Sequence, residues 1–306
     1  MGSVVALLSL ITVVSWGTWI PLAQAASGVP HRTRILYVTA GNIMFAGAAL
    51  AVAGGHLAWG WRSFFLPVAG GVVWTLGNYS AFRAAEAIGL ARAAGSWTPL
   101  NIIVAFVWGA ALFGELAGLS GARFAMLGGA LVLVVAGVLV IVRSQDTRLA
   151  DAPPPRATVP RRAGQHRHGL LWAAAAGVLW GSYFVPAQSA GVTAQVSNFP
   201  LAVGMLAGGL TLVLTSGEPV RLPAAGAAAN LAAGFLFGIG NLALLGLVSR
   251  VGTGVGFTIG QLSLLVNASI GIWLFKVPPP GSRAAKLATA GILIAGTGGV
   301  LIGALR

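Results

Sequence analysis

Long apolar blocks alternate along the chain with short segments that hold most of its charged residues. Each block has about 20 residues, the length that a helix needs to cross the roughly 30 Å hydrocarbon core of a bilayer at about 1.5 Å per residue. The alternation therefore predicts an all-α integral membrane protein with ten transmembrane helices. The predicted spans are 3–22, 35–54, 63–82, 88–113, 124–142, 169–187, 197–216, 224–247, 252–275 and 286–305.

One connection between these spans, 143–168, is much longer than the rest. It combines several arginines with Pro153, Pro154, Pro155 and Pro160, a composition that is polar, interrupts helices and favours a flexible tether. The chain is therefore predicted to consist of a first five-helix unit at 1–142, a basic linker at 143–168 and a second five-helix unit at 169–306.

Basic residues concentrate in the loops that follow odd-numbered spans. Those loops, together with the adjoining ends of the spans, hold Arg32, Arg34, Arg83, Arg92, Arg143, Arg148, Arg156, Arg161, Arg162, Arg167, Arg221, Lys276, Arg283 and Lys286. The even-numbered loops and the termini hold only Arg62, Arg123, Arg250 and Arg306 of the 18 Lys and Arg residues. Because basic loops stay on the cytoplasmic side, the linker is predicted to be cytoplasmic in a cell membrane and both termini extracytoplasmic.

Three short segments of the first unit recur in the same order in the second. They pair 15–24 (SWGTWIPLAQ) with 179–188 (LWGSYFVPAQ), 76–82 (LGNYSAF) with 239–245 (IGNLALL), and 88–95 (IGLARAAG) with 251–258 (VGTGVGFT). Matches in order indicate a duplication. Because each unit has an odd number of spans, the second unit enters the membrane from the opposite side, which predicts two inverted five-helix repeats. Such repeats are typical of secondary transporters, which expose a midplane site alternately to each side.

The composition excludes several functional classes. Charged residues make up 8% of the chain, against about 25% in soluble domains. With no cysteine, disulfides, thiol catalysis and thiolate metal sites are excluded. The formal charge of +13 is spread over the loops, which indicates topology anchors and no nucleic-acid partner. No phosphate-binding loop or HExxH motif is present, so we expect no enzyme, no metal site and no cofactor.

The polar side chains inside the spans are mostly amides, accompanied by indoles. An amide in hydrocarbon needs partners, and a sugar offers hydroxyl groups together with an apolar face that suits an indole. The candidate substrate-binding residues are Asn78, Asn241, Trp74, Trp97, Asn101, Gln261, Trp16 and Trp180. The alternative is that the amides join neighbouring helices and that the tryptophans anchor the membrane interface.

Residue spacing strengthens the case for the third and eighth spans. Trp74 and Asn78 are four residues apart, so both lie on one helix face. The repeat puts Phe237 and Asn241 at the equivalent positions, again an aromatic residue and an amide. We therefore predict that these two spans form walls of the site.

Other residues are candidates for roles in a transport cycle. Trp16 and Trp180 are followed by Pro21 and Pro186, which interrupt backbone hydrogen bonds and make these segments candidate gating hinges. Glu115, near the end of the fourth span, is the candidate for proton coupling, with a structural role at the helix end or a dimer contact as the alternatives. Small residues in the fifth and tenth spans favour close helix packing or a homodimer contact.

Several short motifs carry a family resemblance. They are Trp16-Gly17 with Pro21 in the first span, Gly77-Asn78 in the third, and Ile88, Arg92, Asn101 and the run LFGE at 112–115 in and around the fourth. In these motifs, and in span number and duplication, the chain resembles the bacterial glucose-uptake type of sugar transporters of the drug/metabolite transporter superfamily. The resemblance implies monosaccharide uptake coupled to an ion gradient.

The sequence thus favours a secondary transporter that takes up a monosaccharide or similar small polar solute by alternating access. Two alternatives stay open: an exporter or exchanger of another metabolite or drug, and a scaffold or receptor that transports nothing. The expected partners are the solute, the lipid bilayer, a coupling proton or sodium ion, and a second copy of the chain.

Overall fold

The computed structural model describes residues 2–26, 28–53, 60–88, 90–151, 163–276 and 278–304, and within these ranges it contains helices and no strand. The elements are α1 (Gly2–Gln24), α2 (His31–Val52), α3 (Trp61–Ile88), α4 (Leu90–Phe113), α5 (Gly121–Asp151), α6 (Ala163–Trp180), α7 (Val185–Ser189), α8 (Ala194–Leu214), α9 (Ala224–Val251), α10 (Thr253–Gln261), α11 (Ser263–Ser269), the π-helix η1 (Ile270–Leu274) and α12 (Arg283–Ala304).

The described helices identify a multi-pass membrane protein. Nine segments within the ranges above are long and apolar enough to cross a membrane. The remaining predicted span corresponds to α3, whose hydropathy is lowered by Trp74, Thr75, Asn78, Tyr79 and Ser80. Because α3 packs against α6 and α8 inside the bundle, these polar side chains have protein neighbours.

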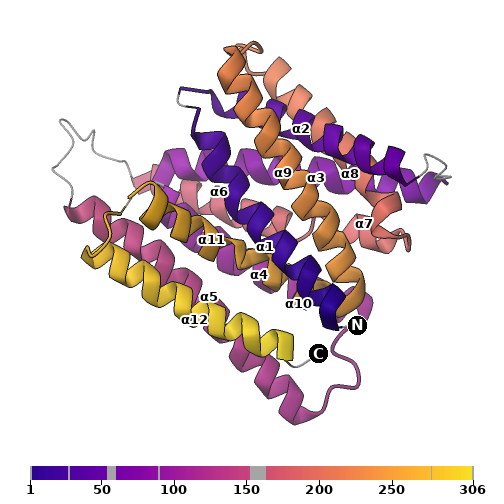
Figure 1. Ribbon diagram of the computed structural model, residues 1–306, viewed down its shortest axis with the longest axis vertical. Coiled ribbons are helices and arrows are strands. Elements are labelled where there is room, and N and C mark those ends of the chain that lie inside the picture. Colours follow the sequence, from indigo (N-terminus) through magenta and orange to yellow (C-terminus); the bar gives the residue numbers. More distant parts are fainter. Residues whose placement is uncertain are drawn as a thin grey trace.

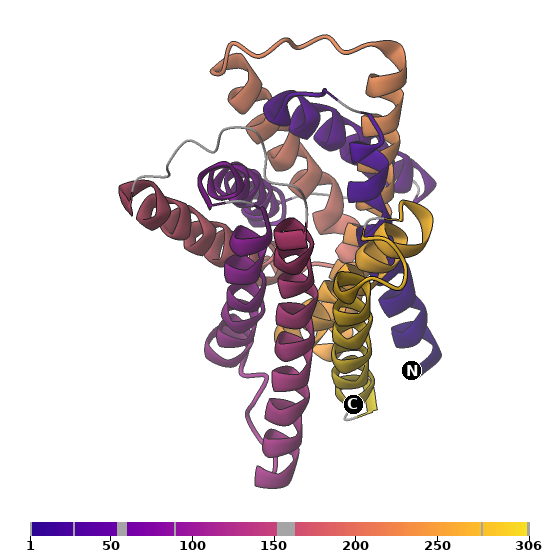
Figure 2. The same cartoon turned by 90° about the vertical axis from the view of Figure 1, so that its left-hand side faces the viewer.

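The start of α1 and the end of α12 lie at the same end of the bundle in both views (Figures 1 and 2). A chain that begins and ends on one side crosses the membrane an even number of times. The placement therefore agrees with ten crossings, α3 included.

Glycines bring the central helices into backbone contact. A Cβ atom at Gly41 of α2 would lie 2.0 Å from the carbonyl oxygen of Leu231 on α9, and one at Gly204 of α8 would lie 2.0 Å from that of Val68 on α3. Only glycine permits such approaches, because any side chain would overlap the neighbouring backbone. These contacts fix how α2, α3, α8 and α9 cross.

The helices α5 and α12 form a separate pair along one flank of the bundle (Figure 1). They meet through Gly137 and Gly291, where a Cβ at either position would lie 2.6 Å from the other residue's carbonyl oxygen. Of the small residues expected at a packing or homodimer face, Gly299 packs against Leu262, whereas Ala125 is exposed and the space beside Gly129 is open. A homodimer through this face stays a prediction.

Two predicted spans are interrupted. The sixth span is interrupted at residues 181–184, between α6 and α7. The break begins at Gly181 and is followed by Pro186, which has no N–H and so cannot donate a backbone hydrogen bond to the preceding turn. The ninth divides into α10, α11 and η1. By contrast α1 runs through Pro21 without a break, because this proline is near the helix end and frees a single carbonyl.

Some helix boundaries differ from the predicted spans. The helix α5 continues to Asp151, although the sequence predicts a linker from residue 143, because the first proline comes only at 153. Residues 152–162 of the predicted linker, and the side chain of Arg92, lie outside the described residues.

Candidate functional site

The two tryptophans that precede glycines lie in corresponding places. The ring of Trp16 on α1 lies against Gly240 of α9, where an added Cβ would be 2.6 Å from its Cδ1 atom. The ring of Trp180 on α6 lies against Gly77 of α3, again at 2.6 Å from Cδ1. Each indole therefore packs against the backbone at the glycine that precedes Asn241 or Asn78.

The two asparagines are both buried but have different partners. The Nδ2 amide of Asn78, 5% exposed, donates to the carbonyl of Trp74 on its own helix at 3.1 Å. The Oδ1 atom of Asn241, 1% exposed, accepts a hydrogen bond from the hydroxyl of Tyr183 at 3.0 Å. Asn78 thus keeps its oxygen available as an acceptor, and Asn241 keeps its amide nitrogen available as a donor.

An aromatic cluster joins the two units between these asparagines. Phe237 lies 5.0 Å from Trp74, 5.9 Å and stacked from Trp16, and 5.4 Å from Trp19, measured between ring centroids. The sequence predicts Trp74 and Phe237 as equivalents in the two units, and the structure puts them in contact. Only Trp16 is parallel to Phe237, whereas Trp74 is tilted and Trp19 is edge-on. The face of an aromatic ring is the kind of wall that the apolar face of a sugar fits.

The fourth span adds to the same region. Trp97 makes an edge-to-face contact with Trp180 at 5.5 Å. Asn101 lies one turn further along α4 and is 3% exposed. Its backbone carbonyl oxygen lies close to Gly181, at the break between α6 and α7. Gln261, the last residue of α10, is half-buried and takes no part in these contacts.

Four of the predicted residues carry a buried polar atom with no hydrogen-bond partner among the residues that the structure describes. They are the indole nitrogens of Trp16 and Trp180, Oδ1 of Asn101 and Nδ2 of Asn241. Leaving such an atom unpaired costs about 1–3 kcal/mol. A molecule that offered both hydroxyl acceptors and donors here would remove that cost.

Glu115 holds one end of the bundle together. Its carboxylate accepts the backbone N–H of Thr253, and that of Gly254 at 3.1 Å, at the start of α10. Gly252, with φ of 89°, leaves room for the carboxylate. The Thr253 hydroxyl lies 2.5 Å from Oε1 of Gln188 on α7. An anion at a helix N-terminus is stabilised by the free N–H groups and the helix dipole. Glu115 therefore caps α10, and its part in coupling stays a prediction.

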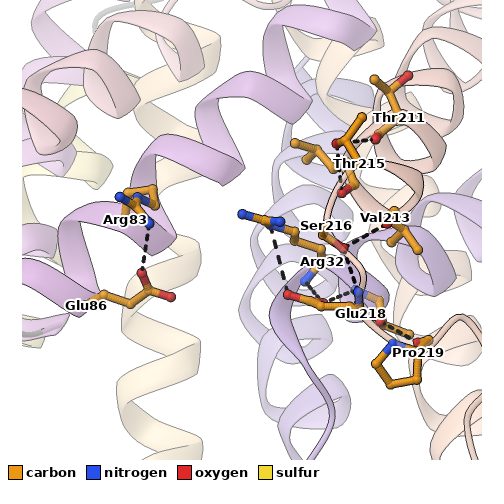
Figure 3. Close-up of polar contacts among 11 residues, drawn as sticks. Arg32, Arg83, Glu86, Thr211, Val213, Thr215, Ser216, Glu218 and Pro219 are labelled. Atoms are coloured by element: carbon orange, nitrogen blue, oxygen red, sulfur yellow. Dashed lines mark hydrogen bonds and ion pairs between the residues drawn. The ribbon is translucent and has the colours of Figure 1, made fainter.

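Glu218 makes a similar contact near the other end of α9. This helix has 28 residues and is therefore about 42 Å long. Glu218 accepts the backbone N–H groups of Arg32 and Thr33 at 3.0 and 3.1 Å, at the start of α2, and its other oxygen lies 4.0 Å from the Arg32 guanidinium (Figure 3). The same view shows a second ion pair, between Arg83 and Glu86 of α3, at 3.8 Å.

Tyr183 and Trp19 are residues that the sequence reasoning missed. Both lie in the duplicated motif, where WGTW of the first unit matches WGSY of the second, so the repeat alignment places them at equivalent positions. Tyr183 is 2% exposed and contacts Asn241, and Trp19 contacts Phe237. The motif's fourth position was the signal that could have found them.

Comparison with known proteins gives the chain its family. The family described as "Sugar transport protein" matches residues 7–305. A protein of Lactiplantibacillus plantarum named for sugar uptake is 25% identical over 268 residues, 88% of each chain. The "Probable glucose uptake protein GlcU" of Staphylococcus epidermidis is 23% identical over 270 residues, 88% of this chain and 87% of its own.

One crystal structure of a chain 21% identical to this one matches its fold with a TM-score of 0.69 over 99% of both chains. The resemblance stated from the short motifs is confirmed by the family match, which covers nearly the whole chain. This chain therefore belongs to the Sugar transport protein family, a family of membrane transporters and not of enzymes.

Proposed function

We propose that this protein takes up a monosaccharide or similar small polyol by alternating access, with its site between α1, α3, α4, α6 and α9. The observation that carries the proposal is the group of four buried polar atoms without partners around an aromatic cluster. Three of them are N–H donors and one is a carbonyl acceptor, a set without formal charge. Such a set suits hydroxyl groups and disfavours a charged solute, which would be stranded without a counter-charge.

The proposal includes two inverted repeats, which equivalent close contacts support. An offset of 163 residues relates Gly41 to Gly204 and Val68 to Leu231. In both contacts a Cβ added to the glycine would lie 2.0 Å from the partner's carbonyl oxygen. The same offset relates Asn42 to Met205, whose side chains touch each other at 3.2 Å. Residues that are equivalent in sequence and also meet in space are expected beside a pseudo-two-fold axis.

Two carboxylates act as the gates in this proposal. Glu115, which follows α4, holds the start of α10, and Glu218, which precedes α9, holds the start of α2. Each contact joins one repeat to the other, at opposite ends of α9. Alternating access requires that only one end opens at a time, so in the cycle one contact breaks while the other stays formed.

Uptake of radiolabelled sugars into proteoliposomes tests the function. We expect saturable entry of at least one of glucose, ribose and similar monosaccharides, and its inhibition by that sugar unlabelled. Empty liposomes and a charged sugar phosphate serve as controls. Entry of none of the neutral sugars, with export of another metabolite or no flux at all, would replace this function by one of the two alternatives.

The same vesicles test ion coupling. A proton or sodium gradient that drives accumulation would show coupling, and Glu115→Gln then shows whether this carboxylate carries it. Because both carboxylate oxygens already accept helix N–H groups, we expect Glu115→Gln to keep the response to the gradient and to change the uptake rate. Loss of the gradient response with sugar exchange retained would instead assign coupling to Glu115.

The proposed orientation puts the Glu218 end in the cytoplasm and the Glu115 end outside, as the distribution of basic residues predicts. The chain has no cysteine, so single cysteines can be added at Ser120, exposed between α4 and α5, and at Val220, 46% exposed between α8 and α9. We expect an impermeant maleimide to label Ser120→Cys in intact cells and Val220→Cys only after permeabilisation. The reverse pattern would invert the topology.

A further inference from the structure

A groove with a volume of about 340 Å³ lies on the outside of the bundle between η1 and the first half of α12. Trp273 of η1 forms one side, and Lys286, Thr289, Ala290 and Leu293 of α12 form the other. It is distinct from the candidate sugar site, which lies between α1, α3, α4, α6 and α9.

The α12 side of the groove changes from cationic to apolar along the helix. Lys286, Thr289, Ala290 and Leu293 are three, four and seven residues apart, so they share one face. Lys286 is in the first turn after Arg283, and Leu293 lies about 10 Å deeper along the axis. This order of ammonium, hydroxyl and apolar side chains matches the order of phosphate, glycerol ester and acyl chain in a phospholipid.

The groove opens beside a group of exposed cations. Lys286 lines the groove, and Lys276, just after η1, and Arg283, the first residue of α12, are exposed as well. Among the side chains that the structure describes, no carboxylate lies within ion-pair distance of these three cations. Cations at the edge of a span attract anionic lipid headgroups.

Two unusual backbone features shape this groove. The π-helix η1 interrupts the ninth span, and Lys276 follows with φ of 55°, a left-handed conformation rare for a residue with a side chain. The turn leaves Trp273, Leu274 and Phe275 57%, 71% and 50% exposed. In a membrane this apolar group and the cations meet at the boundary between hydrocarbon and headgroups, where Trp is favoured.

We propose that this groove binds one anionic phospholipid, with its phosphate at Lys286 and an acyl chain along Trp273 and Leu293. The apolar floor needs a hydrocarbon chain and the cationic mouth needs an anion, so neither a free sugar nor free phosphate satisfies both. A lipid held here would also connect η1, at the end of the ninth span, to α12.

Native mass spectrometry of the purified protein with added phosphatidylglycerol or phosphatidylcholine tests the site. For the wild-type chain we expect the first phosphatidylglycerol to bind several-fold more tightly than phosphatidylcholine. Lys286→Gln should weaken the binding of phosphatidylglycerol about fivefold, the effect of one cation at a membrane surface, and leave the binding of phosphatidylcholine unchanged. Ala290→Trp, which fills the groove, should weaken both lipids.

Arg123→Gln is the matched control, because Arg123 is likewise an exposed cation in the first turn of a spanning helix, α5, away from the groove. This variant should leave the affinity for the first phosphatidylglycerol unchanged. An equal loss in Arg123→Gln would mean that overall charge and not this groove attracts the lipid. Unchanged lipid binding in both Lys286→Gln and Ala290→Trp would overturn the proposal. A dimer of the wild-type chain that is absent in Ala290→Trp would also overturn it, because a second copy of the chain would then occupy the groove.

Discussion

Replacing Asn241 by alanine is expected to weaken sugar binding by about 5- to 150-fold, because a hydroxyl of the solute would lose its amide partner at a cost of about 1–3 kcal/mol. The Nδ2 atom of Asn241 is buried and has no partner in the described part of the chain, so it is the available donor. Asn78→Ala should have a similar effect through the lost Oδ1 acceptor, since its Nδ2 is engaged by Trp74. Solute binding and melting temperature are measured on the same purified proteins.

Asn230→Ala is the matched control for Asn241→Ala. Asn230 lies on the same helix and is fully buried; its Nδ2 donates to the carbonyl of Gly226, and its Oδ1 has no partner among the described residues. It is therefore like the site asparagines in burial and bonding and differs in its position. It is 11 residues earlier, about 16 Å along the axis, toward the Glu218 end. We expect Asn230→Ala to alter stability at most. A lower melting temperature with unchanged affinity in both Asn78→Ala and Asn241→Ala would remove α3 and α9 from the proposed site.

Replacing Gly204 by alanine is expected to destabilise the folded protein by about 3 kcal/mol, the upper part of the range for overpacked interiors. The new Cβ would lie 2.0 Å from the carbonyl oxygen and 2.9 Å from the Cα atom of Val68. Both are backbone atoms, so the clash is relieved only if α8 and α3 move apart. Gly41→Ala should have an equal effect against Leu231. Thermal unfolding in detergent measures both.

Gly128→Ala gives the control for these glycine variants. Gly128 lies on α5 with open space around its Cα, so an added methyl group meets nothing. Alanine also favours a helix over glycine by about 0.5–1 kcal/mol, and the melting temperature should stay the same or rise. A melting temperature of Gly204→Ala equal to that of Gly128→Ala would contradict the close approach of α3 and α8.

Local properties of the chain predicted the membrane character and most helix positions. A block such as 224–247 identifies a span because the transfer of about 20 apolar residues into hydrocarbon is favourable wherever they later pack. The prediction was least complete where the backbone is interrupted, as between α6 and α7 and at η1. There the outcome depends on neighbouring helices, which a window of sequence does not contain.

The sequence predicted which types of side chain form the candidate site, but only some of the residues. The sequence singled out Trp16, Trp74 and Asn241 because indoles and amides are costly in lipid. It treated Trp74 and Phe237 as equivalents but had no means of placing them in contact. It missed Tyr183, since a tyrosine in an apolar span is ordinary until its hydroxyl is seen to donate to Asn241, 58 residues away.

The sequence by itself determined that this protein crosses the membrane many times and that its interior chemistry is amide, hydroxyl and indole, and it predicts that the two halves are repeats. These follow from residue type and spacing along one chain. Only the tertiary structure decided that Glu115 caps α10, that Trp16 packs against Gly240, and that a cationic groove opens beside η1. Such features arise where helices distant in sequence meet, and their distances depend on glycine contacts and helix breaks whose geometry no local pattern contains.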